Sequence, residues 1–143
     1  MKSVYKIDET TWKLEPLADM EHPRDAHGII SWRNQYIIVV GSWHVESSTK
    51  TCEMYDCLTN KWITMPELNY STCAPGMIIV KDRYLYKLGG TTNIRKLEFL
   101  DLTEVLEHAS SKNSVNMEPP QWITINTSNS MGKKSSINRC LLH

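Results

Sequence analysis

The side chains that most often bind metals in proteins are those of histidine and cysteine, and this chain of 143 residues has five histidines and four cysteines. The histidines are His22, His27, His44, His108 and His143. A zinc or copper site needs three or four such ligands, usually at short and regular spacings. Only His22 and His27 are near neighbours, five residues apart across a proline. We therefore expect neither a metal site nor a cofactor.

The cysteines lack the pairing that metal and redox motifs require. They are Cys52, Cys57, Cys73 and Cys140, and no two of them have C-x-x-C spacing. The N-terminal sequence also lacks the apolar core of a secretory signal. Both observations favour reduced, partly buried thiols in a protein of the cytoplasm.

Motifs of common catalytic sites are missing as well. The sequence has no G-x-S-x-G elbow and no glycine-rich phosphate loop. Glu53 and Glu98 are acids at matched positions, and their repetition points to architecture. The sixteen acidic and sixteen basic residues give zero formal charge, which argues against a nucleic-acid partner, and no apolar run has the length of a membrane span. We therefore expect a protein that is not an enzyme and binds neither nucleic acid nor membrane.

An internal repeat determines where these residues lie. Glu53 and Glu98 are 45 residues apart, and so are Asp56 and Asp101. Gly41 and Gly89 are separated by 48 residues, and Trp12 and Trp62 by 50. A repeat of 45 to 50 residues is typical of propellers and solenoids, in which each repeat is one small structural unit.

Each period contains the pattern of a four-stranded antiparallel sheet. Apolar runs at 28–32 and 36–40 are separated by a break of hairpin length, and the same arrangement returns at 76–80 and 84–88. A glycine, a polar loop, the E-x-(Y/L)-D motif and a tryptophan follow in the same order. We predict two four-stranded sheets over roughly 28–64 and 76–125, with positive φ at the glycines and the tryptophans packed between sheets.

This order resembles the kelch repeat, as found in BTB-kelch proteins, in which a double glycine, a Tyr-Asp strand and a tryptophan recur. The stretches that carry the resemblance are IIVVGS, YLYKLGG, EMYDCLTNKW and EFLD, and MEHPRDAHG is similar to the linker between blades. The motif positions are Trp12, Gly41, Tyr55, Asp56, Trp62, Gly89, Gly90, Asp101 and Trp122. Two departures are Gly41-Ser42 in place of Gly-Gly and a longer stretch between Asp101 and Trp122. The resemblance implies an all-β chain with two complete propeller blades and partial flanking blades.

The resemblance also divides the chain. Residues 1–15 are expected to be the last two strands of a preceding blade, at Val4 to Ile7 and Trp12 to Leu14. Residues 16–64 form repeat one, and residues 65–125 form repeat two with an inserted loop at 102–120 that favours a short helix at its start. Residues 126–143 are expected to be a flexible tail with the start of a further strand. The chain then enters and ends in mid-blade, so we expect part of a larger propeller or self-association through open blade faces.

For function, the resemblance implies a non-catalytic protein-protein interaction module, either a scaffold or the substrate-recognition part of a larger protein such as a ubiquitin-ligase adaptor. The alternative is a fragment of a kelch-type propeller enzyme acting on sugars, similar to sialic-acid epimerases or to a copper-dependent oxidase. In a propeller, the loops after strands two and four share one rim, here loops 42–50 and 91–95 and linkers 17–27 and 65–75. The resemblance implies that this rim binds a protein or peptide partner through Arg24, His27, Trp43, His44, Glu46, Tyr70, Asn93 and Arg95.

Overall fold

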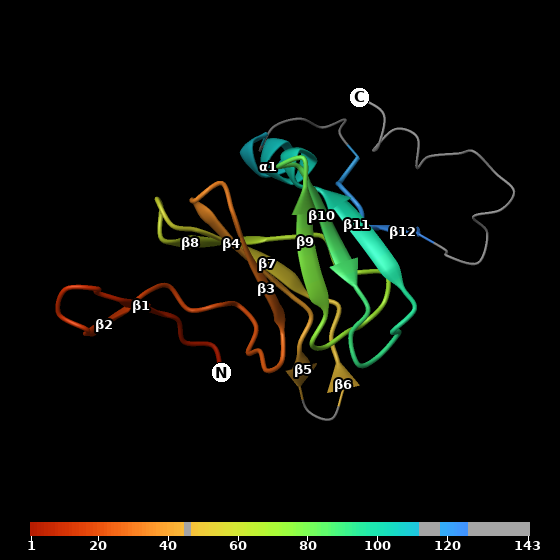
Figure 1. The fold of residues 1–143 in the computed structure, drawn as a ribbon. Helices are drawn as coiled ribbons and strands as arrows, with labels where there is room; N and C mark the ends of the chain where they lie inside the picture. Colours follow the sequence, from red (N-terminus) through yellow and green to blue (C-terminus); the bar gives the residue numbers. More distant parts are fainter. Residues whose placement is uncertain (45–46, 112–117, 126–143) are drawn as a thin grey trace, which may run out of the picture.

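The computed structural model describes residues 1–44, 47–111 and 118–125, which are mostly β. The first sheet contains β3 (Gly28–Trp32), β4 (Tyr36–Val40), β7 (Cys52–Asp56) and β8 (Lys61–Thr64). The second sheet contains β9 (Gly76–Val80), β10 (Tyr84–Leu88), β11 (Leu97–Asp101) and β12 (Ile123–Ile125). Both are antiparallel, and in both the strands pair in chain order (Figure 1). The two predicted sheets are thus confirmed.

Two smaller ribbons accompany the sheets. The N-terminal ribbon pairs β1 (Tyr5–Ile7) with β2 (Leu14–Pro16) in an antiparallel register. The loop ribbon pairs β5 (Trp43–His44) with β6 (Ser47–Ser48) within loop 42–50. In Figure 1, the N-terminal ribbon and the second sheet lie on opposite sides of the first sheet, and the loop ribbon lies at the end away from helix α1 (Leu102–Ser110).

Trp12 does not occupy the expected strand position. It precedes β2 with a positive φ of 57°, its amide donates to the Asp8 carbonyl, and its side chain is 79% exposed. The residue exactly 48 positions before Trp62 is Leu14, which pairs with Ile7 as Trp62 pairs with Tyr55. The prediction that Trp12 fills space between sheets is therefore wrong, because the 50-residue spacing placed the tryptophan two residues too early.

The glycine positions behave as predicted. Gly41 and Gly89 end β4 and β10 with φ of 64° and 57°, and Gly90 has φ of 113°. A Cβ on Gly90 would lie 2.0 Å from the Thr72 Oγ1, so this site also excludes a side chain by close approach. Ser42 takes the corresponding place in the first repeat, where its hydroxyl contacts the backbone of Asp25.

The sheets pack face to face around a shared apolar core. Buried residues of this core are Trp32, Ile38, Val40, Cys52, Met54, Met65, Leu68, Leu85, Leu100, Leu102, Val105 and Trp122. Strands β3 and β9 lie against each other, and Gly28 leaves the space that Pro75 and Met77 fill. The hairpin ends also meet, because the Trp32 indole N–H donates to the Asp82 carbonyl at 3.1 Å and Arg33 pairs with the Asp82 carboxylate at 2.8 Å.

The start of the insertion forms the predicted short helix. Asp101 caps α1 by accepting from the Thr103 amide, and Leu102 and Val105 are buried in the core. The insertion therefore adds buried residues to the core at the end of β11. Its residues 112–117, and the tail predicted over 126–143, lie outside the described residues.

Candidate functional site

A buried carboxylate fastens the preceding linker to each sheet. Glu53 accepts hydrogen bonds from the backbone amides of Glu21 and His22 at 2.8 and 3.3 Å. Glu98 accepts from the Asn69 amide at 2.8 Å. Asn69 lies 48 residues after Glu21, so the two contacts are equivalent. The repeated acids hold the linkers that shape the rim, as their repetition suggested.

Arg24 supplies the positive charge for this contact in the first repeat. Its guanidinium lies 2.7 Å from the Glu53 carboxylate and donates to the Gly41 and Thr51 carbonyls at 2.9 Å each. Burial alone would raise the pKa of Glu53, but the Glu21 amide and the guanidinium outweigh it and hold the pKa below its ordinary value. Arg24 is 3% exposed, so it supports the rim from inside and presents no side chain to a partner.

The second repeat obtains its positive charge from a different element, which the sequence analysis missed. The residue equivalent to Arg24 is Thr72, which donates to the Gly89 carbonyl as Arg24 donates to that of Gly41. The cation is Lys87 on β10, whose Nζ lies 3.7 Å from Glu98 Oε2. Both side chains are fully buried. The signal in the sequence was a lysine within the apolar strand YLYKL, two residues before the glycines.

The remaining motif residues support strands and turns. The indole N–H groups of Trp62 and Trp122 donate to the carbonyls of Ala18 and Pro66 at 2.8 and 2.9 Å, so each tryptophan holds a linker. Tyr55 packs on Trp62 with ring centroids 5.1 Å apart. Asp56 accepts from the backbone amide of Leu58 and from the hydroxyl of Thr59 in the turn before β8, and Asp101 pairs with Arg83 at 2.6 Å.

Backbone hydrogen bonds bring all four predicted rim segments together. The Trp43 amide donates to the Asp25 carbonyl at 2.8 Å, which joins loop 42–50 to linker 17–27. The Ser42 amide donates to the Thr72 carbonyl at 3.0 Å, and the Thr91 amide to that of Cys73 at 3.0 Å. We call the surface formed by loops 42–50 and 91–95 with linkers 17–27 and 65–75 the rim.

Side-chain hydroxyls tie three of these segments at the surface. Ser48 donates to the Ser71 hydroxyl at 3.0 Å, and the Thr92 hydroxyl lies 3.0 Å from that of Ser48 and from the Ser71 carbonyl. The Asn93 side-chain amide also donates to the Ser71 carbonyl, at 3.1 Å. These contacts connect the loop ribbon, the second linker and loop 91–95. The rim is therefore a preformed surface with both its backbone and its polar side chains connected.

The structure sorts the predicted rim residues into two groups. Exposed or half-buried side chains at the surface are those of Trp43, His44, Tyr70, Asn93 and Arg95. The Lys96 ammonium lies over the Tyr70 ring, with its Nζ 4.6 Å from the ring centroid. Ile94, next to Arg95 in the sequence, is also exposed. His27 is half-buried. Its burial and, to a smaller extent, the nearby Arg24 charge lower its pKa below the ordinary value, so the imidazole is neutral at pH 7. Arg24 is buried, and Glu46 lies outside the described residues.

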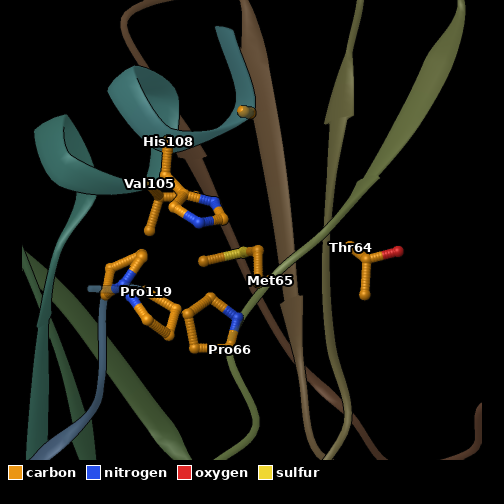
Figure 2. A pocket seen from close by; sticks show the side chains of 8 residues that line it. Thr64, Met65, Pro66, Val105, His108 and Pro119 are labelled. Atoms are coloured by element: carbon orange, nitrogen blue, oxygen red, sulfur yellow. The ribbon is translucent and has the colours of Figure 1, made fainter. Parts of the chain in front are cut away.

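A small pocket lies between α1 and the first residues of the second linker, at the end of the sheets away from the loop ribbon (Figure 1). Figure 2 shows Val105 and His108 of the helix facing Met65 and Pro66. The full lining is Thr64, Met65, Pro66, Val105, His108, Ala109, Pro119 and Pro120, around a volume of about 250 Å³. His108 is the one titratable side chain of this lining, which gives the pocket little polar chemistry.

The described part of the chain contains no group of three or more histidine, cysteine or acidic side chains placed to hold a metal ion. None of its helices combines the length and hydropathy needed to cross a membrane.

Comparison with known protein families matches one stretch of the chain. Residues 34–69, about a quarter of the chain, match the model of the Kelch motif. The match spans β4, β7 and β8 and includes Gly41, Tyr55, Asp56 and Trp62. The two four-stranded sheets are consistent with kelch blades, and the described residues form no closed propeller. The comparison with curated proteins found no match.

Proposed function

We propose that this chain is a non-catalytic protein-protein interaction module that binds a protein or peptide partner on the rim. Such a module serves as a scaffold or as the substrate-recognition part of a larger protein, for example a ubiquitin-ligase adaptor. The observation that carries the proposal is the convergence of four segments, far apart in sequence, on one surface that hydrogen bonds hold in place. A preformed surface binds with less loss of conformational entropy than free loops do.

The side chains on this surface are of the types that anchor interfaces. Trp43 lies on the loop ribbon. Tyr70 lies on the second linker, with Lys96 over its ring, and Ile94 and Arg95 lie on loop 91–95. Tryptophan, tyrosine and arginine are enriched among the residues that contribute most to binding energy. The buried Arg24 contributes indirectly, because it fixes the linker that contains Asp25. The Asp25 carbonyl accepts a hydrogen bond from the Trp43 amide.

The cytoplasm is the proposed location. Cys52 and Cys73 are buried free thiols, and Cys57 is an exposed one. Burial raises the pKa of Cys52 to about 12, which keeps its thiol protonated and unreactive. Free thiols are typical of proteins in reducing compartments.

Selection of random peptides on the immobilised chain, followed by affinity measurement through fluorescence anisotropy, tests the proposed function. Selected peptides are expected to lose at least about tenfold in affinity, about 1.4 kcal/mol, when Trp43 and Arg95 are both replaced by alanine. Both side chains are exposed, so the double variant should keep the melting temperature of the parent chain.

The matched control is Arg33→Ala with Leu58→Ala, which removes an arginine and an apolar side chain from the turns at the opposite end of the first sheet. This control should bind the same peptides with unchanged affinity. Equal affinity for the Trp43→Ala/Arg95→Ala variant, or a selection that yields no binding peptide, would count against the rim as the binding surface.

A further inference from the structure

The second sheet has an apolar face that points away from the first sheet. We call it the open face, and its large apolar residues are Ile78, Val80, Tyr84, Tyr86, Leu88, Leu97, Phe99, Ile123 and Ile125. Phe99 stacks on Tyr86 with ring centroids 5.4 Å apart and meets Tyr84 edge-on at 6.3 Å. Ile78 and Ile123 are 48% and 51% exposed. An apolar face of this kind on a sheet marks a site of association.

The internal repeat indicates what kind of surface covers the open face. Its residues Ile78 and Tyr86 lie 48 positions after Ile30 and Ile38, and Phe99 lies 45 positions after Met54. Those three residues of the first sheet pack in the core that the two sheets share. The open face therefore repeats a face that, within this chain, already binds another sheet.

The covering side of that internal interface has recognisable chemistry. It includes Leu100 of β11 and Trp122, the residue just before β12. These two side chains are 1% and 4% exposed. Gly28 makes room there for Pro75 and Met77, whereas its equivalent Gly76 in the second sheet has no neighbouring atom closer than 3.6 Å. Among the described residues, none fills the space that a further sheet would use next to Gly76.

The N-terminal ribbon carries the same type of covering side chains, and they are exposed. Tyr5, Ile7 and Leu14 lie on one side of the ribbon, because Ile7 pairs with Leu14 and side chains alternate along a strand. Ile7 and Leu14 are 53% and 63% exposed. By the repeat they correspond to Tyr55 and Trp62, and hence to Leu100 and Trp122. The Lys6–Glu15 ion pair takes the other side of the ribbon.

We propose that copies of this chain associate head to tail, with the N-terminal ribbon of one copy packed on the open face of the next. The ribbon and the open face lie on opposite sides of the first sheet (Figure 1), so their contact joins two different copies. Such a contact is heterologous, because each copy contributes a different surface, and it produces a ring or an open chain of copies. The rim is formed by other segments and stays available to a partner in the assembly.

Sedimentation velocity of the full chain over a wide concentration range tests the proposal. The parent chain should show a mass that rises with concentration. Leu14→Glu on the ribbon and Ile123→Glu on the open face should each raise the dissociation constant more than tenfold, because each buries a charge at the contact. The control Leu58→Glu, at a side chain that is 79% exposed in the turn before β8, should associate like the parent.

Mixing the two variants distinguishes a head-to-tail contact from a symmetric one. The Leu14→Glu chain keeps an intact open face and the Ile123→Glu chain an intact ribbon, so the mixture should form a one-to-one pair and nothing larger. A contact between two open faces would survive Leu14→Glu, and a contact between two ribbons would survive Ile123→Glu. Either result, or a parent chain that stays monomeric at every concentration, would overturn the proposal. Circular dichroism confirms that each variant is folded, and Ile78→Glu replaces Ile123→Glu if the latter unfolds.

Discussion

Replacing Arg24 by alanine is expected to lower the free energy of unfolding by about 3–5 kcal/mol, the typical cost of removing one partner from a buried ion pair. The Glu53 carboxylate would stay buried without its cation, and the Gly41 and Thr51 carbonyls would lose their donor. Urea unfolding at pH 7 measures this loss. The rim should also loosen, because the linker held by this contact carries Asp25.

A surface ion pair provides the matched control for this prediction. Arg33 pairs with Asp82 at 2.8 Å, with both side chains largely exposed. Arg33→Ala should cost at most about 1 kcal/mol, since solvent screens such pairs. Equal losses for Arg24→Ala and Arg33→Ala would contradict the assignment of Arg24 as the cation that fixes the linker.

The pH dependence of stability gives a second readout for the same contact. The pKa of Glu53 is lower in the folded chain than its ordinary value of 4.5, so ionised Glu53 favours folding. This contribution is present in full above pH 4.5 and is lost as the pH falls through the folded pKa. The Arg24→Ala variant should lose less of its remaining stability over that acidic range than the parent chain does.

Replacing Lys87 by valine should lower the free energy of unfolding by about 3 kcal/mol, because it leaves the Glu98 charge buried without a cation. Valine is the residue that the first repeat has at the equivalent position, Val39, so the new side chain fits a strand of this kind. Adding Glu98→Gln should recover at least about 1 kcal/mol, since glutamine is uncharged and still accepts from the Asn69 amide.

A double-mutant cycle by urea unfolding measures the coupling between Lys87 and Glu98. The exposed Lys61 on β8 gives the control, and Lys61→Val should change the unfolding free energy by less than about 0.5 kcal/mol. Additive effects of Lys87→Val and Glu98→Gln would show that the pair does not act as a unit.

Local patterns in the sequence were sufficient to predict the two sheets. Apolar runs, hairpin breaks and the ordered motifs of the repeat located the strands of both sheets, and positive φ at Gly41 and Gly89 followed from the need to end one strand and open a loop. The structural role of Glu53 and Glu98 was also predicted from their repetition. These features depend on residues that are close in sequence or related by the repeat, so they can be predicted from a single sequence.

The features that the sequence did not predict depend on contacts between distant segments. Arg24 was expected at the partner surface, but its side chain turns inward because Glu53, 29 residues away, needs a cation. Lys87 replaces that cation from another strand, which no local pattern encodes. The prediction for Trp12 was wrong for another reason. The spacing between tryptophans does not distinguish one in a turn from one in a strand.

The two proposed surfaces make separate demands on the chain. The rim depends on linkers that Glu53 and Glu98 hold, so Arg24→Ala should weaken peptide binding as well as folding. Association depends on the ribbon and the open face, so Leu14→Glu should leave peptide affinity unchanged. Failure of one proposal therefore leaves the other standing.

Hydrogen-deuterium exchange of the full chain, with and without a bound selected peptide, tests most directly whether the rim is the interaction surface. The peptide should slow exchange in loops 42–50 and 91–95 and in linkers 17–27 and 65–75, which hydrogen bonds already join. The turns at 57–60 and 81–83 and helix α1, which lie at the end of the sheets away from the loop ribbon (Figure 1), should exchange at unchanged rates. Protection confined to those turns or to α1, with the four rim segments unaffected, would contradict the rim as the binding surface.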